Sequence, residues 1–195
     1  MPPKPKFTRE QITAAALDLV SEKGMDALTA RELGKHLGSS AQPIFTVFNS
    51  MEEVQDAVRD AALTRFESFS NKVPAGMPAY LQIGMQMVLF AKEEPRLYLL
   101  RFLPENRDGE LYDDIYSRMG TMVRQCLDAL QNDYSMSRQD AKNVFQHMWI
   151  YIFGVGTLCA TGAYAVSPDQ FLKNLESDFM KLMKLIQSPS PDTEG

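Results

Sequence analysis

The sequence has little cysteine, little histidine and no excess of positive charge. Its 195 residues include two cysteines and two histidines, and 20 Lys and Arg residues stand against 25 Asp and Glu, giving a net charge of −5. Cys126 and Cys159 lie in apolar stretches, which favours isolated buried thiols over a disulfide. The negative net charge excludes a protein that binds nucleic acid through an overall basic surface.

The sequence also lacks a continuous apolar run of membrane-spanning quality. Residues 144–166 carry no charged side chain, but Gln146, His147, two threonines and three glycines interrupt them. This favours a helix buried on several sides over a membrane span. The first ten residues, MPPKPKFTRE, have no apolar core of a secretory signal. We therefore expect a cytoplasmic protein without membrane contact.

Catalytic and cofactor-binding patterns are missing as well. His36 and His147 have no neighbours at the spacing of metal ligands, and no glycine-rich phosphate loop occurs. The carboxylates of Glu93 and Glu94 are sequence neighbours, so on a helix they point in different directions. We therefore expect a protein that is not an enzyme and binds no cofactor and no metal.

What the sequence does contain is a series of helix signals. The capping-box pattern, a Ser or Thr followed three residues later by Gln or Glu, occurs at Thr8, Thr29 and Ser50. These signals predict a first helix that ends at Gly24, a short second helix that stops at Gly38, and a long helix from Ser50 to about residue 70. No strand-like alternation occurs, so we expect an all-α fold.

The segment GSSAQPIFTVFNSM, residues 38–51, contains no charged residue. It predicts a further short helix, with Ser40 as its N-cap and Pro43 in its first turn. Ile44 and Phe48 are four residues apart and are expected to face the core. The predicted order is therefore a helix, a short helix, a glycine turn and another short helix. This is the order of a helix-turn-helix unit.

Two prolines and a glycine break the helical pattern in NKVPAGMP, residues 71–78. Ser167, Pro168 and Gln170 later give a strong helix start. The final residues, 189–195, are expected to form a disordered tail. Between the break and the tail, apolar spacing predicts helices near residues 78–93, 96–103, 110–132, 138–161 and 168–187.

Glycines and apolar residues at fixed spacing form one longer pattern over about residues 8–60. Its main positions are Gly24, Leu28-Thr29, Leu33-Gly34, Leu37-Gly38, Ile44-Phe45, Phe48 and Glu52-Glu53. With this pattern the N-terminal part resembles the TetR/AcrR family of transcriptional regulators. AKEEPRLYLLRF, residues 91–102, together with Trp149, is more loosely similar to the family's C-terminal domain.

The resemblance implies an all-α protein with an N-terminal three-helix helix-turn-helix DNA-binding domain. A connecting helix would join this domain to a C-terminal helical domain for ligand binding and dimerisation. Here the first domain is expected over residues 1–48, the connecting helix over about 50–71 and the second domain over 72–188. The implied function is a ligand-responsive repressor that binds a palindromic operator in double-stranded DNA as a homodimer.

The resemblance also assigns DNA contacts to residues of this sequence. Residues 41–43 and Thr46 are expected to approach base edges, and Thr29 and Arg31 the DNA backbone. An uncharged segment is compatible with this role, because bases are read through donors, acceptors and apolar surface. A basic N-terminal arm is as compatible with a solvated tail as with a DNA contact. The expected DNA-binding residues are Thr29, Arg31, Ser39, Ser40, Ala41, Gln42, Pro43, Phe45, Thr46, Val47, Lys4 and Lys6.

Two positions depart from the family pattern. Phe45 stands where the family usually has Tyr, and Met51 where it usually has Lys, and both usual residues contact phosphates. Two expected phosphate anchors per subunit are therefore missing. The alternative interpretation is a helical small-molecule-binding protein with little or no DNA affinity.

Methionines and aromatic residues beyond the break predict an adaptable apolar pocket for an unidentified small apolar effector. Plain core packing is the alternative for each of these residues. The homodimer contact is expected on the helices near 138–161 and 168–187, because they carry excess apolar surface. The expected ligand-binding residues are Met85, Tyr98, Phe102, Met119, Met122, Phe145, Met148, Trp149 and Phe153.

Overall fold

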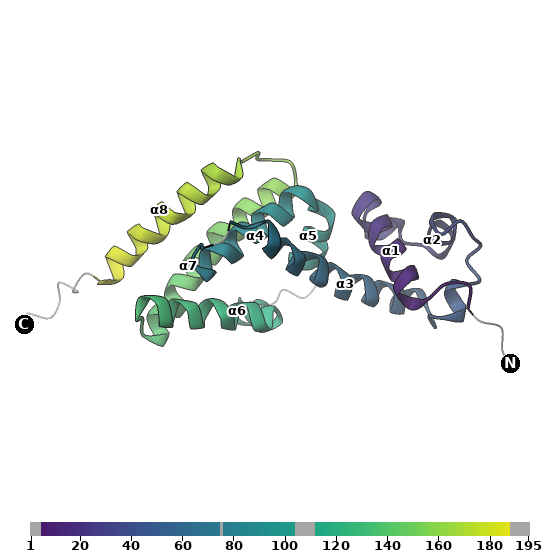
Figure 1. Cartoon of the computed structure of the whole chain (residues 1–195), viewed down its shortest axis with the longest axis horizontal. Helices are drawn as coiled ribbons and strands as arrows, with labels where there is room; N and C mark the ends of the chain where they lie inside the picture. The colour runs from purple at the N-terminus through teal and green to yellow at the C-terminus, as the bar shows by residue number, and fades with distance from the viewer. Residues whose placement is uncertain (1–4, 75, 104–111, 188–195) are drawn as a thin grey trace, which may run out of the picture. The chain divides into compact units, whose positions relative to one another are not determined.

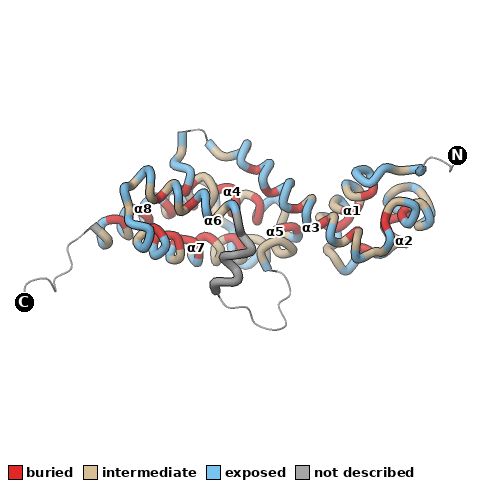
Figure 2. Tube along the Cα trace, turned by 90° about the horizontal axis from the view of Figure 1, so that it is seen from below, coloured by how far each residue is buried: buried red, intermediate tan, exposed pale blue. Residues whose placement is uncertain are grey.

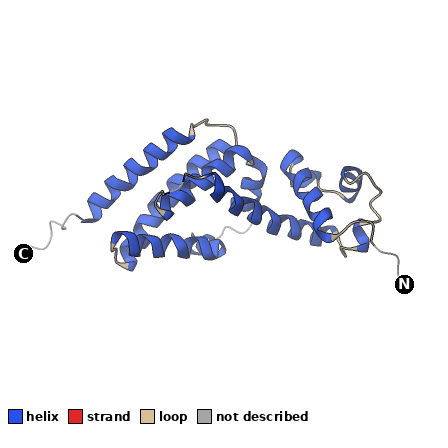
Figure 3. Ribbon diagram, in the orientation of Figure 1, coloured by secondary structure: helices blue, strands red, loops and turns tan. Residues whose placement is uncertain are grey.

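The computed structural model describes residues 5–74, 76–103 and 112–187, with the backbone alone described over 112–120. All regular structure in these ranges is helical, which confirms the all-α prediction (Figures 1 and 3). Three 3-10 turns accompany the helices: η1 (Met25–Ala27), η2 (Ile44–Thr46) and η3 (Phe69–Lys72). The α-helices are α1 (Arg9–Lys23), α2 (Ala30–His36), α3 (Met51–Ser68), α4 (Ala79–Glu93), α5 (Pro95–Phe102), α6 (Tyr112–Tyr134), α7 (Arg138–Ala160) and α8 (Pro168–Gln187).

Packing divides the chain into two compact units. Unit 1 comprises Met1–Phe69 and Phe90–Glu105, and unit 2 comprises Ser70–Leu89 and Asn106–Gly195. The helix α4 therefore begins in unit 2 and ends in unit 1. Among the described residues, no helix combines the length and apolar character needed to cross a bilayer.

The helices of unit 1 begin and end where local chemistry dictates. At the start of α1, Thr8 Oγ1 accepts from Gln11 N, and the Gln11 side chain accepts in return from Thr8 N. Gly24 ends the helix with a φ of 87°, a conformation that glycine adopts without steric cost. Thr29 and Ser50 also cap α2 and α3, where their hydroxyl oxygens accept from the backbone N–H groups of Glu32 and Glu53. These capping predictions are confirmed.

The core of unit 1 lies where α1 packs against α3 and α5. Figure 2 shows buried and exposed positions alternating along α3, and its buried residues recur at a spacing of four. One of them, Phe66, meets two other aromatic rings edge to face: the centroid of Phe90 is 5.4 Å away and that of Phe102 is 5.3 Å away. Such pairs add stabilisation beyond the burial of their area.

Glu94 joins three helices of unit 1 through its carboxylate. Ser21, on α1, donates from Oγ to Glu94 Oε2 at 2.6 Å. Arg65, on α3, donates from Nη2 and Nε to Glu94 Oε1 at 2.8 and 3.0 Å. Glu94 itself directly precedes α5, so this one side chain fixes α1, α3 and α5 relative to one another.

In unit 2, close helix packing depends on a glycine. A Cβ at Gly84 on α4 would lie 2.9 Å from Ile152 Cδ1 and 3.0 Å from Leu175 Cδ2. The missing side chain therefore lets α4 approach α7 and α8 together. Further along α8, the ring of Phe179 contacts those of Tyr80 and Tyr134, with centroids 5.4 and 5.0 Å away.

Candidate nucleic-acid interface

The segment between α2 and α3 does not form the short helix that the sequence predicts. It contains a turn and the three-residue η2, and Ser40 is not a helix cap. The first turn closes where Ile44 N donates to Ala41 O at 3.1 Å. Pro43 has no N–H to extend this pattern backwards. The Thr46 hydroxyl donates to Pro43 O at 2.7 Å, a local bond that competes with regular helix formation.

The segment nevertheless buries the residues predicted to face the core and exposes others to solvent. Ile44 and Phe48 are buried, at 0% and 1% exposure, which confirms their expected place in the core. Gln42, Phe45 and Thr46 are exposed. One side of the segment is therefore anchored in unit 1, and the other presents an uncharged surface to solvent.

The backbone of the segment rests directly on α2. A Cβ at Gly34 would lie 2.8 Å from the carbonyl carbon of Ser40 and 2.9 Å from Ala41 N. Real Cβ atoms do not approach backbone atoms so closely, so this packing requires glycine. The sequence marks Gly34 only as one position of a longer pattern. The one local indication of this close packing is that Gly34 is a glycine inside an otherwise regular helix.

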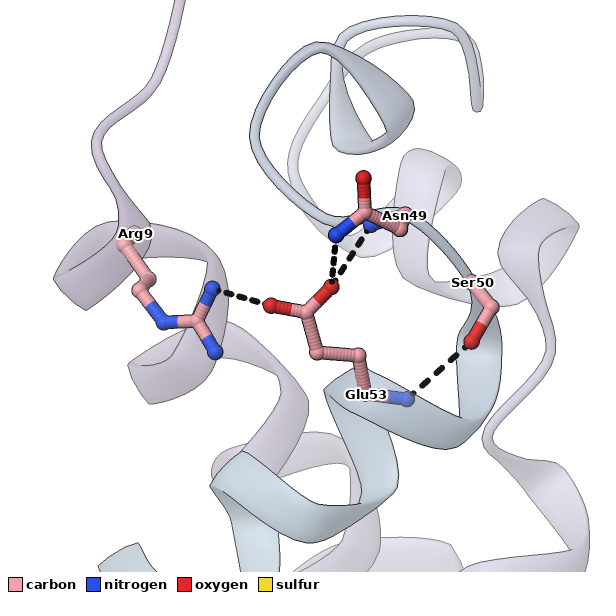
Figure 4. A network of polar contacts seen from close by, with 4 residues as sticks. All are labelled: Arg9, Asn49, Ser50 and Glu53. Atoms are coloured by element: carbon pink, nitrogen blue, oxygen red, sulfur yellow. Dashed lines mark hydrogen bonds and ion pairs between the residues drawn. The ribbon is translucent and has the colours of Figure 1, made fainter.

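Glu53 holds the C-terminal end of the segment against two helices (Figure 4). Its Oε1 accepts from Arg9 Nη1 at 2.6 Å, while its Oε2 accepts from the Asn49 backbone N at 2.7 Å and from Asn49 Nδ2 at 2.9 Å. The backbone N–H of Asn49, followed by Arg9, holds the pKa of Glu53 below its ordinary value. We call these three residues, Arg9, Asn49 and Glu53, the Glu53 clamp.

Arg9 has a structural role in the Glu53 clamp. Its guanidinium also stacks over the Phe48 ring, 4.2 Å from the ring centroid. The sequence predicts the capping contact between Ser50 and Glu53, but not that the Glu53 carboxylate reaches Asn49 and Arg9. Arg9 and Glu53 are 44 residues apart, and no local pattern links them.

The N-terminal arm lies, at Lys6, beside the turn that precedes residues 41–47, which we call the recognition segment. Lys6 Nζ donates to Ser39 Oγ at 3.0 Å. Lys4 falls outside the described residues. On α2, Arg31 is exposed, and the exposed Thr29 uses its hydroxyl as the helix cap. The remaining predicted positions lie on the segment, with Ser40 exposed and Ser39, Ala41, Pro43 and Val47 half-buried.

The predicted ligand-binding residues are divided between the two units. Tyr98 and Phe102 belong to unit 1, where their ring centroids are 5.0 Å apart in its aromatic core. The others belong to unit 2, and the side chain of Met119 lies outside the described residues. Met85, Phe145, Met148 and Trp149 are buried, and Met122 and Phe153 are half-buried.

Three of these side chains form one row along α7. The rings of Phe145 and Trp149 stack with centroids 5.8 Å apart, and Phe153 continues the row 6.0 Å from Trp149. Spacing of four residues places them on one face of the helix. The assignment of a ligand site to these residues stays a prediction.

Residues 12–58 match the family described as bacterial regulatory proteins, tetR family. The match covers most of α1, all of α2, the recognition segment and the first part of α3. Through these residues the N-terminal part of the chain is similar to the tetR family. An uncharacterised helix-turn-helix-type transcriptional regulator of Mycobacterium tuberculosis is 31% identical over 71 residues. That similarity spans 36% of this chain and 33% of the relative.

One solved structure extends the similarity of the fold to nearly the whole chain. A TetR variant from Acinetobacter baumannii, in complex with minocycline, is 16% identical with a TM-score of 0.53, covering 94% of this chain and 99% of that one. Mycobacterium smegmatis AmtR is 15% identical with a TM-score of 0.46, covering 94% and 89%. The first similarity confirms the predicted fold.

Proposed function

We propose that this chain binds a palindromic operator in double-stranded DNA as a homodimer and represses transcription from it. The observation that carries the proposal is the recognition segment over residues 41–47. Ile44 and Phe48 anchor it in the core, and Gln42, Phe45 and Thr46 are exposed. Such a surface reads bases through hydrogen bonds and apolar contact, for which charge is not needed. The regulator acts in the cytoplasm.

Phosphate contacts come from cations around this segment. Arg31 and Lys35 are exposed on α2, and Lys6 is held beside the turn by Ser39. Cations that neutralise phosphates position a protein on DNA without reading sequence. The negative charge of the whole chain does not oppose this, because six basic and five acidic residues fall within residues 1–50.

Apolar side chains left exposed on unit 2 support the homodimer. On α7, Ile150 is 61% exposed and Leu158 is 47% exposed, and on α8 Met180 is 53% exposed. Between the first two, a Cβ at Gly154 would meet no atom within 4 Å, so another helix has room to approach closely there. A two-fold dimer carries two helix-turn-helix domains, which we call reading heads, and its symmetry matches that of a palindromic operator.

We further propose that a small apolar molecule binds among the aromatic and methionine side chains of unit 2. Its binding causes the protein to dissociate from the operator. The row of Phe145, Trp149 and Phe153 on α7 supports this part. Methionines at Met85 and Met148 supply side chains that adapt to ligands of different shape.

Selection of genomic fragments by the purified full-length chain tests the proposal. We expect one palindromic sequence to be enriched, with binding that weakens steeply as salt rises. A chain that retains no fragment at low salt would contradict the proposal. That result would favour a small-molecule-binding protein without DNA affinity.

A further inference from the structure

Phe45 stands out on the surface of the recognition segment. Its side chain is 47% exposed, while those of Ile44 and Phe48 on the opposite side are 0% and 1% exposed. Burial of both anchors fixes the direction of the residue between them. Since apolar area in water is unfavourable, burial of the Phe45 ring against a ligand would be favourable.

Several polar groups around Phe45 are already used inside the protein. The Thr46 hydroxyl donates to Pro43 O at 2.7 Å, and Asn49 Nδ2 donates to Glu53 Oε2 at 2.9 Å. Ser39 Oγ accepts from Lys6. The Thr46 hydroxyl proton and one Asn49 amide proton are therefore committed within the protein, and Phe45 is the large apolar side chain that this segment leaves exposed.

A phenyl ring donates no hydrogen bond, so a phosphate oxygen offers it no favourable contact. On the major-groove edges of the bases, the apolar group is the C5-methyl of thymine, and Phe is one of the side chains suited to contact it. We propose that Phe45 is a specificity-determining residue that reads a thymine methyl group in each operator half-site. The same contact accepts 5-methylcytosine, which carries its methyl at the same position. This inference rests on the proposed operator binding.

Replacement of thymine by uracil in the selected operator tests the inference. Uracil keeps the base pair and O4 and removes only the methyl group. Each thymine is replaced in turn, symmetrically in both half-sites, and affinity is measured by titration of the full-length wild-type chain. At one position we expect affinity to fall about fourfold per half-site, or about 15-fold for the symmetric pair, as for loss of one buried methyl each.

The same position is then tested with cytosine and 5-methylcytosine. We expect 5-methylcytosine to bind more tightly than cytosine, by about the same factor as thymine exceeds uracil. In Phe45→Ala both ratios are expected to approach one. Leu63→Ala, which removes an exposed apolar side chain from α3 outside the segment, is the matched control and keeps both ratios.

Two results would overturn the inference. Specific operator binding that is unchanged by every thymine-to-uracil replacement would show that Phe45 does not read a methyl group, with the proposed function intact. Methyl-sensitive binding that persists fully in Phe45→Ala would assign the contact to another residue. Absence of operator binding altogether would overturn both the proposed function and this inference.

Discussion

At the scale of single residues, the candidate interface is divided between residues that face solvent and residues that hold the segment in place. Gln42 belongs to the first group and Gly34 to the second. The sequence predicts the first group well, because an exposed polar residue between buried apolar ones follows from helical spacing. It misses why Gly34 is needed, because the atoms that exclude a Cβ come from a later turn.

Replacement of Gln42 by Ala should separate operator binding from general DNA binding. The Gln42 amide offers a donor and an acceptor to a base edge, so its loss should weaken operator binding by about 1–3 kcal/mol. Affinity for random DNA should change little, because phosphate contacts remain. Titrations of both DNAs at one salt concentration check this. Equal losses on the two would show that Gln42 reads no base.

Gly34→Ala should destabilise unit 1 through a steric clash. The new Cβ meets backbone atoms of Ser40 and Ala41, which cannot move aside as a flexible side chain does. We expect a loss of about 1–3 kcal/mol in the free energy of unfolding, typical of overpacking. Lys35→Ala, which truncates the neighbouring exposed residue of α2 without adding a Cβ, is the control and should keep the wild-type midpoint. Unchanged denaturant midpoints for Gly34→Ala would refute the close contact.

At the scale of elements, the Glu53 clamp adds contacts from α1 and α3 to the local hydrogen bonds of the recognition segment. The sequence predicts the described helix boundaries to within about two residues because caps and breaks are local. It fails for the recognition segment because Pro43 and the Thr46 hydroxyl favour a 3-10 turn there. The contact from Glu53 to Arg9 has no local signature at all.

Glu53→Gln should remove a pH-dependent part of the stability. Because the folded protein lowers the pKa of Glu53, its carboxylate stabilises the fold above the unfolded pKa of about 4.3. This contribution is lost as pH falls through the lower, folded pKa. Thermal unfolding of wild type and Glu53→Gln should therefore differ at pH 7, and the difference should shrink below about pH 4.

The control for this prediction is Glu67→Gln, which removes an exposed carboxylate near the other end of α3 and leaves the Glu53 clamp intact. It should unfold like wild type at pH 7. A difference between wild type and Glu53→Gln that stays constant from pH 7 to 3 would show that the carboxylate charge is not what holds Asn49 and Arg9.

At the scale of the whole molecule, the proposed regulator requires two reading heads and therefore a dimer. The apolar residues left exposed on α7 and α8 are the best candidates for that contact. Aspartate at the centre of such a surface buries an unpaired charge if the dimer forms, which is strongly unfavourable. The isolated protomer is not penalised, since the position is exposed in it.

Leu158→Asp should therefore convert the dimer to a folded monomer. Sedimentation at micromolar concentration should show the change in mass, and operator affinity should fall by roughly 100-fold or more as bivalent binding is lost. Leu103→Asp, at an exposed apolar position of unit 1, should remain dimeric. A wild-type chain that sediments as a stable monomer would contradict the dimer itself.

The sequence by itself predicted the described α-helices, their N-terminal caps and the similarity to the tetR family, because each rests on residues close together in the chain. It also predicted that Ile44 and Phe48 face the core. The tertiary structure alone decided that Tyr98 and Phe102 belong to unit 1, whereas the remaining predicted ligand residues belong to unit 2. It alone revealed the Glu53 clamp and the contact of Gly34 with the recognition segment. These features depend on side chains and backbone that meet only after folding, so no local spacing in the sequence predicts them.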